Sequence, residues 1–199
     1  MPSKVDIANY ALGQVGAQTI TSFADDSAEA RAVNLLYDSV RDATLRSHPW
    51  NFAIARARLA RLTETPAFTW SYYYQLPADF LRLLEVNPST RDPYRLEGNR
   101  IATNASTCEI VYVRRIEDET QFDPLFVQAF ATRLAIELAQ TLGNAQGAQL
   151  VAQLWEQYRL KIAEARSTDA MENPPEVLEF DYLTDSRYGD WRYRRLKWY

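Results

Sequence analysis

The spacing of apolar residues changes twice along this chain, and that change restricts the possible folds more than any other feature. Before about residue 50 and after about residue 123, apolar residues recur every three or four positions, as in helices that pack on a core. Between residues 51 and 116 they alternate or form short runs, which is typical of strands. The sequence therefore predicts an α+β fold, a helical bundle with a small, mostly antiparallel inserted sheet and an extended C-terminal tail.

Capping residues predict where the helices begin. We expect four helices, at 3–16, 26–47, 123–142 and 145–168. Ser3 with Asp6 forms a capping pattern, Asp26 precedes the second apolar stripe, and Asp123 followed by Pro124 is a favourable start for the third. The third and fourth helices are separated by a short Gly-Asn loop, so we expect them to form an antiparallel hairpin.

Three features predict the strands of the sheet region. The stretch TWSYYYQLP places Trp70, Tyr72, Tyr74 and Leu76 on one face of a strand. Gly98-Asn99 is suited to a two-residue hairpin turn. The stretch CEIVYVRRI is apolar on both faces, which favours a central strand.

Composition limits the class of protein. The chain has 199 residues and a net charge of -4, so charge as a whole does not favour nucleic-acid binding. The single cysteine, Cys108, allows no intramolecular disulfide, and we expect it to be an ordinary buried thiol in a protein of a reducing cytoplasm. The N-terminus lacks an apolar signal region and no apolar run approaches the ~20 residues of a membrane span, so we expect no membrane partner.

The usual catalytic patterns are missing from the sequence. His48 is the only histidine, which excludes a multi-histidine metal site, and its place at a predicted helix end favours hydrogen bonding to the exposed carbonyl groups there. The carboxylates cluster near helix starts (Asp25, Asp26, residues 117–119 and Asp123), where they are expected to act as caps. We therefore expect no enzyme and no cofactor.

The final segment differs in composition from the rest of the chain. Residues 1–169 are expected to form the body, and the two prolines of ENPPEV separate it from a tail at 170–199. The tail is first acidic and then aromatic and basic, ending in RYGDWRYRRLKWY. Three interpretations remain open: a segment folded back on its own domain, a nucleic-acid contact, and a protein-docking tail built from the residue types that dominate interfaces. The candidate docking residues are Arg187, Tyr188, Trp191, Arg192, Tyr193, Arg194, Arg195, Leu196, Lys197, Trp198 and Tyr199.

Several stretches in sequence order resemble one known family. They are ALGQVGAQTITSFADDSAEARAVNLLYDSVRDATLRSHPWNFAIARARL with its Pro49-to-Ala53 element, YYYQLPADFLRLLEV with Leu76, Pro77 and Asp79, YRLEGNRIAT, and EIVYVRRIEDETQFDPLFVQAFATRLAIELA. Their order and spacing over roughly residues 5–142 are similar to those of bacteriophage head-to-tail adaptors, the tail tubular protein A or head completion connector family of podophages. The tail matches this family in character only.

The resemblance implies a structural role in the virion. Adaptors of this family form a ring, typically a dodecamer, under the portal protein at the head-tail junction. Such a ring continues the channel through which genomic DNA passes during ejection and provides the platform for a tail nozzle similar to tail tubular protein B. The resemblance further implies that the chain assembles in the bacterial host cytoplasm and that its C-terminal tail anchors it to the portal. The alternative is a nucleic-acid-binding module that uses the basic aromatic tail.

Overall fold

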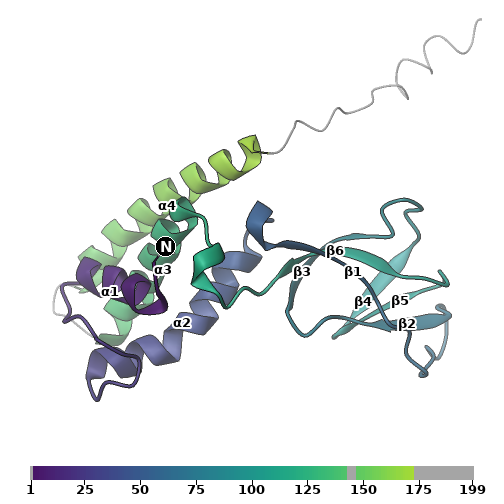
Figure 1. Ribbon diagram of the computed structural model, residues 1–199, viewed down its shortest axis with the longest axis horizontal. Coiled ribbons are helices and arrows are strands. Elements are labelled where there is room, and N and C mark those ends of the chain that lie inside the picture. Colours follow the sequence, from purple (N-terminus) through teal and green to yellow (C-terminus); the bar gives the residue numbers. More distant parts are fainter. Residues whose placement is uncertain (1, 143–146, 173–199) are drawn as a thin grey trace, which may run out of the picture. The chain divides into compact units, whose positions relative to one another are not determined.

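Helices and antiparallel strands together form the α+β fold predicted from the sequence (Figure 1). The computed structural model describes residues 2–142 and 147–172. The chain divides into two units, residues 1–169 and residues 170–199. All helices and strands described below belong to the first unit, except for the last two residues of the final helix.

Within residues 2–142 and 147–172, four α-helices account for the helical part, with bounds close to those expected. They are α1 (Lys4–Gln14), α2 (Ala28–Arg46), α3 (Pro124–Leu142) and α4 (Gly147–Met171), and short 3-10 helices lie at Asn51–Ala53 and Glu119–Gln121. The helix α4 continues past the expected end at 168 and stops ahead of the first proline of ENPPEV, because a residue before proline avoids the helical conformation. The predicted loop between α3 and α4 lies outside the described residues.

Capping explains where three helices start. Ser3 and Asp6 form the predicted capping box at α1. The Asp123 carboxylate accepts hydrogen bonds from the backbone N–H groups of residues 125 and 126, at 2.8 and 3.1 Å, as expected for the cap of α3. The expected start of α2 at Asp26 is wrong: Ser27 is the cap and accepts a bond from the Ala30 N–H at 3.1 Å, while Asp26 pairs with Arg31. Serine and aspartate are about equally good caps, so the sequence alone could not show which of the adjacent residues Asp26 and Ser27 caps α2.

Gly16 ends α1 in the way that its sequence position predicts. It has φ of 68°, a conformation that side chains rarely adopt. Its N–H donates to the Gly13 carbonyl at 3.2 Å, and the Ala17 N–H donates to the Leu12 carbonyl at 3.1 Å. These two bonds are those of the Schellman motif, so the last carbonyl groups of the helix are satisfied.

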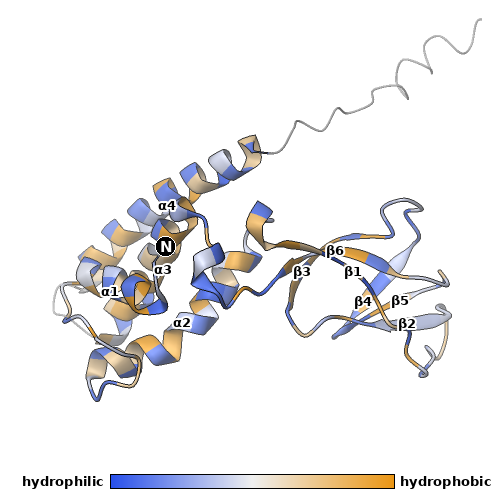
Figure 2. Ribbon diagram, viewed as in Figure 1, coloured by the Kyte–Doolittle hydropathy of each residue, from blue (hydrophilic) through white to orange (hydrophobic). Residues whose placement is uncertain are grey.

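The helices enclose a large hydrophobic cluster that is rich in aromatic rings. Trp50 is 1% exposed and packs on Phe126 with ring centroids 5.1 Å apart. Phe52 and Phe122 also contact Phe126, and Phe130 stacks on it at 6.0 Å. In Figure 2 the helices carry both hydrophobic and hydrophilic residues along their lengths, as amphipathic helices do.

In the part of the chain that the structure describes, six strands form two antiparallel sheets instead of one. They are β1 (Ile54–Arg58), β2 (Tyr72–Gln75), β3 (Phe80–Val86), β4 (Tyr94–Glu97), β5 (Arg100–Thr103) and β6 (Glu109–Arg114). The first sheet has the order β1-β6-β3, so the predicted central strand is confirmed, and the second has the order β2-β5-β4. Gly98-Asn99 forms the predicted turn between β4 and β5, with a φ of 61° at Gly98.

A second hydrophobic cluster holds the two sheets together. It includes Tyr74 and Ile101 from the second sheet and Ile110 and Tyr112 from the first. The inner faces of the sheets therefore pack on each other, and that packing gives the strand region a core separate from the helical one. Trp70, which was expected on the same strand as Tyr74, precedes β2 and lies in a turn.

Candidate interaction surfaces

The eleven tail residues predicted to bind a partner all lie outside the described residues. Of the predicted tail at 170–199, the structure describes residues 170–172, of which the first two complete α4. The docking prediction for Arg187 to Tyr199 therefore stays a prediction. The described residues offer two other features that bear on function, a polar junction at the end of α4 and a free strand edge.

Asp169 joins the end of α4 to the segment that follows α2. Its side chain is buried, and its Oδ1 accepts a hydrogen bond from the Asn51 backbone N–H at 2.9 Å. The Asn51 side-chain amide donates to the Asp169 carbonyl oxygen at 2.6 Å. Asp169 is the last residue of the first unit, so these bonds fix the end of that unit.

His48 contributes to this junction instead of capping its own helix. Its Nε2 lies 3.3 Å from Oδ2 of Asp169, and its ring packs edge-on against Trp50. At the end of α2 the Thr44 carbonyl oxygen accepts bonds from the Ser47 hydroxyl at 2.8 Å and the Trp50 indole N–H at 3.2 Å. The predicted hydrogen bonds from His48 to the carbonyl groups at the end of α2 are therefore not found among the described residues, and the Thr44 carbonyl accepts from Ser47 and Trp50 instead.

The junction should make stability depend on pH near neutrality. Burial lowers the pKa of His48 below its ordinary value of 6.5, as do Arg166 and Arg82, while Asp169 opposes the shift. The unfolded chain then binds the proton at a higher pH than the folded chain, so stability is full above pH 6.5 and falls as the pH drops below it. We expect His48→Gln, which removes the titrating group, to lose this part of the pH dependence.

Urea unfolding at about pH 7.5 and about pH 5.5 tests this expectation. The difference in unfolding free energy between the two pH values should be larger for the unmodified chain than for His48→Gln. Both proteins share every other titrating group, so their comparison isolates His48. Equal differences would contradict the assignment.

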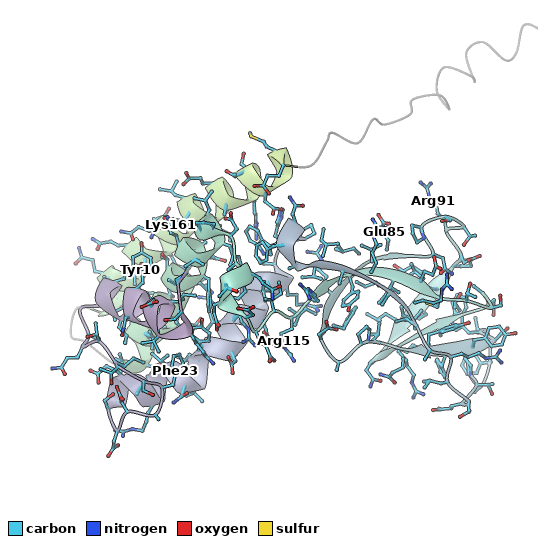
Figure 3. The ribbon with its side chains drawn as sticks, viewed as in Figure 1. Tyr10, Phe23, Glu85, Arg91, Arg115 and Lys161 are labelled. Carbon is cyan, nitrogen blue, oxygen red and sulfur yellow. The ribbon has the colours of Figure 1, made fainter. Side chains whose placement is uncertain are left out.

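Charged side chains link the helices to the end of β6. The Asp42 carboxylate accepts bonds from Arg41 on the same helix at 2.9 Å and from Arg115 at 2.7 Å. Arg41 is buried, and its guanidinium also contacts Asp38, which pairs with Lys4 of α1 at 3.2 Å. Figure 3 shows Arg115 in the region where α2 and the strands meet. Because each charge is paired, this network is best explained as a structural contact that connects α1, α2 and the residue after β6.

Cys108 has the inert environment predicted for it. It is buried, and burial raises the pKa of its thiol to about 11. The thiol is therefore protonated near neutral pH and a poor nucleophile. Within residues 2–142 and 147–172 no group of three or more metal-binding side chains comes together.

The strand β4 forms an open edge of the second sheet. It pairs with β5, and among the residues that the structure describes no strand pairs with its other side. All four of its residues are exposed. Tyr94 lies opposite Thr103 of β5, and Leu96 lies opposite Ile101, which belongs to the core between the sheets, so both side chains are on the inner face. They nevertheless remain 41% and 45% exposed. The two sheets therefore do not close over each other along β4.

A hollow lies on each face of β4. The inner one, of about 320 Å³, is lined by Tyr94 of β4, Val86 of β3, and Pro88, Arg91 and Asp92 of the connecting loop. Asn87 braces that loop, since its side chain donates to Asp92 at 3.0 Å and accepts from the Glu109 N–H at 2.7 Å. In Figure 3 Arg91 and Glu85 lie near each other and point outward.

The outer hollow, of about 390 Å³, is lined by aromatic rings and by Arg95. Phe68 and Trp70 stand on either side of Thr69, whose φ of 71° is unusual for a β-branched residue. The Trp70 N–H donates to the Phe68 carbonyl at 2.8 Å, so these residues form a tight turn of a strained type. The turn leaves Phe68 81% exposed beside β4. Sequence reasoning missed this surface, although the run of aromatic residues around Thr69 was a visible signal.

No protein-family model and no curated protein matches this sequence. Among the helices of the described parts of the chain, none is long and apolar enough to cross a membrane. What can be concluded about function therefore depends on the residues and geometry of the chain itself.

Proposed function

We propose that this chain is a virion structural protein, a head-to-tail adaptor that forms a homo-oligomeric ring, expected to be a dodecamer, under the portal. In this role it is anchored by its C-terminal tail, extends the channel for genomic DNA, and provides the platform for the tail nozzle. The observation that carries the proposal is the order and spacing of four sequence blocks similar to those of the adaptor family. The site of action would be the head-tail junction of the virion.

The parts played by residues within these blocks support a structural role. Trp50, from the Pro49-to-Ala53 element, lies in the helical core. Leu76 belongs to the core of the strand region, and the carboxylate of Asp79 accepts a bond from the Tyr112 hydroxyl at 3.1 Å. These residues build the fold, so within these blocks they serve structure and do not line a reaction site.

A ring provides a physical reason for the composition of the tail. Trp, Tyr and Arg are the residue types that contribute most to binding energy at protein interfaces. When several tails of one ring bind the same partner, the first tail to bind makes the binding of the others intramolecular. The ring as a whole then dissociates slowly even if each single tail binds with moderate affinity. A head-to-tail ring also requires two different complementary faces on each subunit.

The second candidate is a nucleic-acid-binding module, favoured by the five cations of RYGDWRYRRLKWY. If all five bound phosphates, affinity for DNA would fall by about 500-fold between about 50 and about 200 mM salt. An interface anchored by aromatic side chains depends much less on salt. We therefore expect the affinity of the chain for portal rings to fall by less than about tenfold over the same range.

Titration of labelled protein with purified portal rings and, in parallel, with duplex DNA provides the measurement. Tight portal binding with a shallow salt dependence supports the adaptor. Absence of portal binding together with steeply salt-dependent DNA binding would instead favour the nucleic-acid module.

A further inference from the structure

We propose that the outer hollow beside β4 binds one sugar ring of an uncharged oligosaccharide, a pyranose whose ring substituents are equatorial, as in glucose. The lining of this hollow comes from the turn that holds Phe68 and Trp70, from β2 and from β4. The proposal goes beyond the adaptor role and does not depend on it.

The register of the second sheet brings the polar and aromatic lining residues together. Tyr73 of β2 and Arg95 of β4 both lie opposite Ala102 of β5, so these residues form one row across the outer face of the sheet. Glu97 lies two positions after Arg95 and therefore on the same face. The hollow has a volume of about 390 Å³, which is within the range of about 300–1,000 Å³ for small-molecule sites.

Aromatic rings determine one half of the ligand's chemistry. Phe68 is 81% exposed, and within residues 2–142 and 147–172 neither Phe68 nor Trp70 packs against another aromatic ring. The face of an aromatic ring is electron-rich and attracts the weakly positive hydrogen atoms of a ligand. A pyranose with equatorial substituents has a flat face of C–H groups, which suits such a ring.

Unused hydrogen-bonding groups determine the other half. Among the residues that the structure describes, the Arg95 guanidinium and the indole N–H of Trp70 donate no hydrogen bond. The Glu97 carboxylate accepts a bond from the Tyr73 hydroxyl at Oε2, at 2.9 Å, and its Oε1 accepts none from the described residues. A sugar hydroxyl both donates and accepts, so neighbouring hydroxyls of one ring can use these donors and this acceptor together.

The charges around the hollow are balanced, which favours an uncharged ligand. Arg95 and Glu97 line the hollow. Arg100, beside them, pairs with Glu64 at 2.6 Å, and its guanidinium lies 4.5 Å from the centre of the Tyr73 ring. An anionic ligand would meet the Glu97 carboxylate and a cationic one would meet Arg95, so neither sign of charge is selected.

The turn that carries the two rings is held in place by hydrogen bonds. The Ser71 N–H and hydroxyl both donate to the side-chain oxygen of Asn104, at 2.9 and 3.0 Å. The Trp70 N–H closes the turn on the Phe68 carbonyl at 2.8 Å. The backbone at the rings is therefore fixed before a ligand arrives, which lowers the ordering cost of binding.

Titration of the full chain with cellotetraose and, separately, with chitotetraose tests the proposal. Both probes are uncharged and have equatorial ring substituents. We expect at least one to bind saturably in isothermal titration calorimetry, with a dissociation constant of about 1 mM or below. The constant should change by less than about twofold between about 50 and about 500 mM salt, because no ion pair forms. If neither probe binds at about 10 mM, the proposal is overturned.

Substitutions locate the site. Phe68→Ala and Trp70→Ala should each weaken binding by about tenfold. Arg95→Met keeps an apolar stem and removes the donors, so it should weaken binding by about threefold to tenfold. The matched control is Tyr94→Ala, which removes an exposed tyrosine from the inner face of the same strand and should leave binding unchanged. Equal effects at residues 68 and 94 would overturn the proposal.

Adenosine separates a sugar ring from a planar base as the ligand. It is uncharged, and its base also stacks on aromatic side chains. If adenosine binds more tightly than both oligosaccharides, the hollow accepts a base and the proposal is wrong, whereas weaker binding of adenosine supports it. Portal binding is measured separately, so failure of the adaptor role and failure of this proposal are distinguishable.

Discussion

A chain that ends at Asp190 should fold normally and no longer bind portal rings. The deletion removes Trp191 to Tyr199, which include two tryptophans and four of the five cations of the final segment. Both hydrophobic clusters belong to residues 1–169, and the deleted residues lie in the second unit. We therefore expect unchanged thermal unfolding and loss of binding in a pull-down with portal rings.

Substitution of single residues gives a graded form of this result. Trp191→Ala and Trp198→Ala should each reduce the binding free energy by about 2 kcal/mol or more if these side chains anchor the tail. Phe68→Ala is the matched control, because it removes an exposed aromatic ring that is distant in sequence from the tail. It should leave portal binding intact. Portal binding that persists in the deleted chain would show that the anchor lies elsewhere.

Trp50→Ala should destabilise the fold by about 3–5 kcal/mol, the range for large aromatic residues in well-packed cores. The side chain is 1% exposed, contacts Phe126 and Phe52, and donates its indole N–H to the Thr44 carbonyl. Its removal leaves a cavity, while the Thr44 carbonyl oxygen keeps its bond from the Ser47 hydroxyl. Urea unfolding at neutral pH measures the loss.

Trp70→Ala serves as the matched control for Trp50→Ala. Trp70 lies in the turn before β2 and is partly exposed, so its removal should cost about 1 kcal/mol or less. A loss below about 1 kcal/mol for Trp50→Ala would contradict the packing described here. The result also bears on the sequence resemblance, because it tests whether the Pro49-to-Ala53 element serves folding instead of partner binding.

Local patterns were sufficient to predict most elements of the fold. Ser3, Asp6, Asp123 and Pro124 mark helix starts because caps act within one turn of chain. Gly98 marks the hairpin because a two-residue turn needs a positive φ there. The α+β class was predicted from the change in the spacing of apolar residues near residues 50 and 123. The error at Asp26 arose between adjacent residues with nearly equal capping ability.

Contacts between distant segments could not be predicted in this way. His48 and Asp169 are 121 positions apart, and no local pattern indicates that they pair. The division of six strands into two sheets depends on register between β1, β3 and β6, which are separated by long stretches of chain. The candidate docking residues from Arg187 to Tyr199 remain predictions, since they lie outside the described residues.

The order of polar and apolar residues therefore determined which segments become helix or strand, because that choice depends on neighbours a few positions away. Tertiary structure alone decided that β4 keeps a free edge flanked by Phe68 and Arg95, and that Asp169 is held beside His48. Both outcomes depend on which distant segments cover a surface and which leave it open, and no short stretch of sequence contains that information.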